Sequence, residues 1–148
     1  MQLTRAADYA VRVMIHLASL QPGTRVNRDA LATAAEVPTH FLSKVLQSLV
    51  RARLIVAHRG TSGGFALAVP AEQVSVLRIV EAVEGPIQLN ICTASGHGCI
   101  RQGWCPAHLV WLEAQAALTQ VLRSASIAKL AGQPATTPRQ DKVIYPWN

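Results

Sequence analysis

Apolar residues recur every three or four positions along the first half of the chain, which is the period of an amphipathic helix. The pattern predicts three helices, over residues 4–19, 27–35 and 39–52. Val37-Pro38-Thr39 forms the turn between the second and the third. Two short helices joined by a tight turn are a helix-turn-helix candidate, a motif whose second helix enters the major groove of DNA.

The next segment changes from helical to strand-like periodicity. Residues 54–57 and 65–69 are short, apolar and β-prone, and Pro70 ends the second of them. Between them stands the flexible, basic run His-Arg-Gly-Thr-Ser-Gly-Gly, which predicts a β-hairpin with Arg59 near its tip. A helix-turn-helix followed directly by a basic hairpin is a winged helix. We therefore predict a mainly α fold with one small β-hairpin.

The polar face of the predicted helix over 39–52 has side chains suited to base edges and phosphates in a major groove. Arg59 of the hairpin suits the narrow, electronegative minor groove. For each polar helix residue the alternative is an ordinary solvent-facing position. The predicted DNA-binding residues are Thr39, His40, Ser43, Lys44, Gln47, Arg59 and Gly60.

Beyond the hairpin, the pattern predicts a helix over 74–84, a long helix from Pro106 to about Ser124, and one more helical turn through Ala131. The long helix exposes more apolar surface than one small domain can cover, so we expect it to pair two copies of the chain. The predicted regions are a winged helix-turn-helix domain (1–85), a loop (86–105), a dimerisation helix region (106–131) and a mobile tail (132–148).

Composition adds to this picture. The 148 residues are 50% hydrophobic and 15% charged, which indicates a globular protein. Residues 1–60 contain eight basic and three acidic side chains out of a total net charge of +6, so the positive charge is concentrated where DNA is predicted to bind. No run of about 18 apolar residues could span a bilayer. We expect a cytoplasmic protein with no membrane partner.

All three cysteines lie in one glycine-rich loop, with six residues between Cys92 and Cys99 and five between Cys99 and Cys105. His108 follows three positions later. An odd set of thiols in a reducing compartment favours metal or redox chemistry over disulfides, and thiolates are the ligands of iron–sulfur clusters. Cys105 also stands at a predicted helix start, where the helix dipole stabilises a thiolate.

Two other chemistries are open to this loop. A zinc site with three cysteines and His108 is one, although structural zinc sites use closely spaced cysteine pairs that the loop lacks. The other is a nucleophile built from Cys105 and His108, but no third group at a recognisable spacing would orient it. We therefore do not expect an enzyme.

These features together resemble the family of dimeric winged-helix iron–sulfur transcriptional regulators that includes IscR, NsrR and RirA. The resemblance covers about residues 1–131, and the first cysteine interval is one residue longer than in the members compared. It rests on Leu3-Thr4 with Asp8-Tyr9-Ala10-Val11-Arg12, on the wing Arg59-Gly60-Thr61-Ser62-Gly63-Gly64-Phe65, and on the three-cysteine loop ahead of a long helix.

The resemblance implies a homodimeric repressor that binds a palindromic operator in double-stranded DNA. It would sense nitric oxide, redox state or iron status through a cluster held by three cysteines and one other ligand. In NsrR-like members an aspartate of the partner subunit completes a [4Fe-4S] cluster, and Asp8 matches it. In IscR-like members a histidine completes a [2Fe-2S] cluster, and His108 matches it. We favour Asp8 and [4Fe-4S]; the alternative function is a regulator with a structural zinc or a thiol redox switch.

Overall fold

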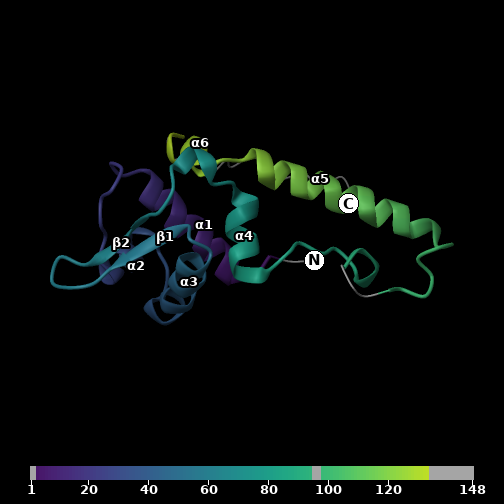
Figure 1. The fold of residues 1–148 in the computed structure, drawn as a ribbon, viewed down its shortest axis with the longest axis horizontal. Coiled ribbons are helices and arrows are strands. Elements are labelled where there is room, and N and C mark those ends of the chain that lie inside the picture. Colours follow the sequence, from purple (N-terminus) through teal and green to yellow (C-terminus); the bar gives the residue numbers. More distant parts are fainter. Residues whose placement is uncertain (1–2, 95–97, 134–148) are drawn as a thin grey trace, which may run out of the picture.

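The computed structural model describes residues 3–94 and 98–133, and it consists of a helical body from which a long arm projects (Figure 1). The body contains one two-stranded antiparallel sheet. The elements in chain order are α1 (Arg5–Ala18), α2 (Arg28–Ala34), α3 (Thr39–Arg51), β1 (Ile55–His58), β2 (Gly64–Leu67), the 3₁₀ turn η1 (Ala71–Gln73), α4 (Val76–Glu84), the 3₁₀ turn η2 (Ile91–Thr93), α5 (Pro106–Ser124) and α6 (Ile127–Ala131).

The helices begin where the sequence supplies a capping side chain. Thr4, Asn27, Ser75 and Ser126 each accept a hydrogen bond from the backbone N–H three residues on, at the starts of α1, α2, α4 and α6. Each cap contributes about 1 kcal/mol. Cys105 precedes α5, and proline occupies its first turn. The helices predicted from apolar periodicity are confirmed, whereas η1 and η2 were not predicted.

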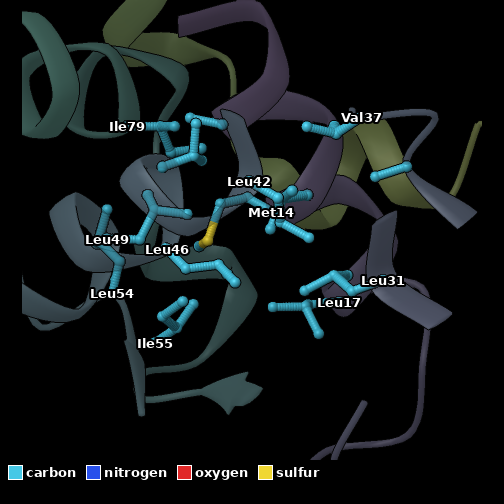
Figure 2. Packing of buried hydrophobic residues seen from close by; sticks show 14 of the residues in the cluster. Met14, Leu17, Leu31, Val37, Leu42, Leu46, Leu49, Leu54, Ile55 and Ile79 are labelled. Carbon is cyan, nitrogen blue, oxygen red and sulfur yellow. The ribbon is translucent and has the colours of Figure 1, made fainter. Parts of the chain in front are cut away.

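Buried side chains from α1, α2, α3 and α4 form one core, seen from close by in Figure 2. Met14, Leu31, Leu42 and Ile79 are fully excluded from solvent. So is Ile127 of α6, whose N–H donates to the carbonyl oxygen of Val74 at 2.9 Å. The chain therefore returns to the body after the long helix, instead of ending on it.

The hairpin is held in register by four residue pairs, from Ile55 opposite Leu67 to His58 opposite Gly64. Its predicted strands are confirmed with boundaries displaced by one or two residues. A short bridge from the α1–α2 segment extends the sheet: Val26 N–H donates to the Phe65 carbonyl at 3.0 Å, and Phe65 N–H donates back at 2.8 Å. The wing is therefore attached to the segment that leads into α2.

The arm consists of α5 and the segment that runs beside it from the end of α4 (Figure 1). Leu118 and Leu122 pack against Leu77 and Val80 of α4, which fixes the base of the arm. His108 is the one buried residue of α5. Among the described residues, no helix is long and apolar enough to cross a membrane. Most of the predicted tail, residues 134–148, lies outside the described residues.

Candidate metal centre and nucleic-acid interface

A cavity of about 410 Å³ lies in the arm, between η2, the cysteine loop and the first turns of α5. All three thiols are half-buried in its wall. Because η2 carries Cys92 and α5 begins immediately after Cys105, the two ends of the loop are fixed by local structure. The lining residues are Asn90, Ile91, Cys92, Cys99, Ile100, Arg101, Gln102, Cys105, His108 and Trp111.

His108 is the unusual member of this wall. Its side chain is 7% exposed, and its Nδ1 is buried with no hydrogen-bond partner among the described residues. A buried polar atom without a partner costs about 1–3 kcal/mol, so such atoms call for an explanation. An imidazole nitrogen facing three thiols has the chemistry of a metal ligand.

The donor set fits a cluster better than a single ion. In the described part of the chain, no three His, Cys, Asp or Glu side chains converge closely enough to hold one metal ion. Zinc requires such convergence, because its ligands meet at one atom about 2.0–2.3 Å away. In a cluster the thiolates bind different iron atoms, so donors spread around a cavity wall are compatible with it.

Asp8, the other predicted ligand, lies on α1 and does not line this cavity. Its Oδ2 is 2.9 Å from a guanidinium nitrogen of Arg12, and its side chain is 54% exposed. The structure of one chain therefore brings together Cys92, Cys99, Cys105 and His108 but not Asp8. Ligation by Asp8 remains a prediction that requires a second subunit.

Gln115, which the sequence reasoning missed, tethers the segment that carries Cys92. Its Oε1 accepts a hydrogen bond from the backbone N–H of Leu89 at 3.0 Å, twenty-six residues away along the chain. Trp111 of α5, which also lines the cavity, was missed as well. Neither position carries a signal in the sequence, because both contacts depend on how the segment from 86 to 105 folds back beside α5.

The predicted DNA-binding residues lie on α3 and in the turn of the hairpin. Thr39, His40, Lys44 and Gln47 are exposed and Ser43 is half-buried. Arg59 and Gly60 are exposed in the turn between β1 and β2. The hairpin and the cysteine cavity lie toward opposite ends of the chain (Figure 1). Direct contact of these residues with DNA remains a prediction.

A winged helix-turn-helix with a basic reading face and a separate arm lined by thiols defines a class of DNA-binding regulators. The chain belongs to the Rrf2 family: the family model, described as an iron-dependent transcriptional regulator, matches residues 3–133. Members of this family are DNA-binding transcriptional regulators and not enzymes.

Individual relatives agree with this assignment. A putative HTH-type transcriptional regulator of Mycobacterium tuberculosis is 34% identical over 134 residues, covering 89% of this chain and 82% of that protein. The HTH-type transcriptional regulator NsrR of Geobacillus kaustophilus is 30% identical over 131 residues, covering 88% and 89%.

Solved structures confirm the winged-helix fold. The structure of T. potens IscR matches with a TM-score of 0.71 at 20% identity, covering 93% of this chain and 94% of that one. The oxidized form of Staphylococcus aureus CymR matches with a TM-score of 0.72 at 25% identity, covering 92% and 100%.

Proposed function

We propose that this transcriptional regulator senses nitric oxide, redox state or iron status through an iron–sulfur cluster held in the cavity of the arm. Cys92, Cys99 and Cys105 are its thiolate ligands, and one further ligand is not a cysteine. The observation that carries the proposal is the shared cavity, in which three half-buried thiols face the unpartnered Nδ1 of His108. When bound, the cluster supplies a reactive centre that the signal can alter or remove.

Within one chain, the structure supports His108 as the fourth ligand. Its nitrogen is already in the cavity wall, and ligation removes the cost of leaving that nitrogen buried without a partner. Asp8 is the alternative, and it already has a partner in Arg12. That pair is exposed and joins residues four apart on one helix, so only about 0.3–0.5 kcal/mol would oppose its release.

The arm supports action as a homodimer. Large apolar side chains of α5 stay exposed in the single chain: Val110 is 59% and Val121 is 64% accessible to solvent. A second α5 would cover this face, and a twofold dimer presents two reading helices to a palindromic operator.

The base of the arm connects the cavity to the reading helix through α1. Ile87, at the start of the arm, packs in one cluster with Ala7 of α1. Tyr9, two residues along α1, stacks against Phe41 of α3 with ring centroids 5.7 Å apart. A change in how the loop is held therefore has a packed route to α3, and a small change in the spacing of two reading helices weakens binding to both half-sites.

A thiol redox switch is the second candidate, because a relative of the same fold, Staphylococcus aureus CymR, is known in an oxidized form. In the present structure Cys92, Cys99 and Cys105 are free. Structural zinc has less support, since the described donors do not converge on one point.

Anaerobic purification tests the proposal. We expect a coloured protein that contains iron and acid-labile sulfide, with the chromophore absent in Cys99→Ala. Gln102→Ala is the matched control, because Gln102 lines the same cavity without a thiol and its replacement should leave the colour intact. A colourless protein with one equivalent of zinc, or with neither metal, would exclude the cluster.

A further inference from the structure

A groove of about 580 Å³ separates α3 from the hairpin, at the end of the body away from the arm. One wall is the stripe Ser43, Gln47 and Arg51 of α3, and the floor is apolar. Arg28, from the start of α2, lies at the groove as well. The lining residues are Arg28, Ser43, Leu46, Gln47, Val50, Arg51, Ala57 and Phe65, which include two arginines and no acid.

Arg28 reaches this place because of the bridge between Val26 and Phe65. The two backbone hydrogen bonds of 3.0 and 2.8 Å hold the start of α2 against β2, and Arg28 follows Val26 by two residues. Gly64 permits the approach, since a Cβ there would stand 2.6 Å from the carbonyl oxygen of Val26. The two arginines, far apart in sequence, are therefore brought to one groove by main-chain geometry.

The occupant of the groove follows from the geometry of a winged helix on DNA. α3 reads the major groove, and Arg59 in the hairpin turn is placed for the neighbouring minor groove. One sugar–phosphate strand separates a major groove from the adjacent minor groove, so that strand must pass between α3 and the hairpin. We propose that this groove seats that strand, with Arg28 and Arg51 contacting its phosphates and the apolar floor facing its sugars.

The nearby charges are compatible with this role. The Nε of Arg28 is 3.4 Å from Oδ1 of Asp29, and both side chains are mostly exposed, at 54% and 80%. An exposed pair of neighbouring residues contributes at most about 1 kcal/mol, so a phosphate can compete for the guanidinium. Guanidinium groups are well matched to phosphate oxygens because they offer several N–H donors in one plane. This inference rests on the DNA binding of the family and is independent of the cluster.

Salt dependence of DNA binding tests the proposal. Full-length protein is titrated into a labelled mixed-sequence duplex about three helical turns long, at several KCl concentrations, and binding is followed by fluorescence anisotropy. Arg28→Gln and Arg51→Gln are each expected to lower the slope of log K against log[KCl] by about 0.9 for every phosphate that the arginine neutralises. Between about 50 and 200 mM KCl, the affinity gap to the unmodified protein then narrows about threefold for each such phosphate.

Arg78→Gln is the matched control, because it removes the same charge from an exposed position on α4 that does not line the groove. Its slope should equal that of the unmodified protein. The conservative variants Arg28→Lys and Arg51→Lys keep the charge and should restore the slope, which separates phosphate contact from a role in folding. Equal slopes for Arg78→Gln and both groove variants, or no restoration by lysine, would overturn the proposal and assign the groove to something other than the DNA backbone.

Discussion

Replacement of Gly64 by alanine tests how the wing is attached to the rest of the reading domain. A Cβ at this position would lie 2.6 Å from the carbonyl oxygen and 2.8 Å from the carbonyl carbon of Val26, and 3.1 Å from the backbone nitrogen of Asn27. All three atoms belong to the backbone, so no side-chain rotation relieves the contact. β2 and the segment before α2 must move apart.

Separation of these segments removes the two hydrogen bonds between Val26 and Phe65. Each such bond contributes about 1 kcal/mol net, so Gly64→Ala should lower the free energy of unfolding by at least about 2 kcal/mol. For a chain of this length, that corresponds to a fall in melting temperature of about 4–8 °C. Arg28 is displaced in the same movement, so DNA affinity should fall as well.

Gly23→Ala is the control for backbone strain alone. Gly23 has a φ of +82°, but a Cβ there meets no atom within 4 Å. Left-handed backbone costs an alanine about 1–2 kcal/mol, and nothing else should change. Urea denaturation and anisotropy on the same samples separate the two variants. If Gly23→Ala weakened DNA binding as much as Gly64→Ala, the attachment of the wing through Val26 would not be what places Arg28.

Two shorter predictions concern the turn of the wing and the tether of the loop. Arg59→Ala should lower the salt slope of DNA binding by about one unit, and an unchanged slope would remove Arg59 from the interface. Gln115→Leu should speed the decay of visible absorbance in air, because the backbone N–H of Leu89 is left without its acceptor; Gln120→Leu, exposed on the same helix, should not. Equal decay rates in these two variants would show that the tether does not hold the loop.

Local signals in the sequence were sufficient for most of the fold. The helix starts at Thr4, Asn27 and Ser75 were predictable because a cap acts within three residues of itself. The hairpin was predictable from strand-forming residues on both sides of a glycine-rich turn. Its exact boundaries were not, because strand ends depend on the partner strand rather than on neighbouring residues in the chain.

Long-range contacts explain what the sequence did not reveal. The groove beside α3 depends on Val26 meeting Phe65, and the burial of Ile127 depends on α6 returning to the body. The pattern of cysteines led to the hypothesis of a metal site, and it placed His108 in the candidate set. That Nδ1 of His108 lacks a partner could not be predicted, because burial of one ring follows from how η2, the loop and α5 enclose the cavity.

The identity of the fourth ligand and the state of assembly can be tested together. His108 belongs to the cavity of its own chain, whereas Asp8 lies on α1 outside that cavity and can reach a cluster only from a partner subunit. Val121→Asp places a charge on the exposed apolar face of α5, thirteen residues and about 20 Å along the helix from His108. Sedimentation should show a monomer, because two buried carboxylates would face each other across a dimer.

If His108 is the ligand, that monomer should keep the visible spectrum of the unmodified protein, and His108→Ala should change it. If the monomer instead takes on the spectrum of Asp8→Ala, while His108→Ala leaves the spectrum unchanged, the ligand comes from the partner. We expect the first result, since an unpartnered nitrogen is already in the cavity wall and Asp8 must first leave Arg12. Removal of the cluster would then alter α5 and the loop of each subunit first, and α1 only through Ile87 and Ala7.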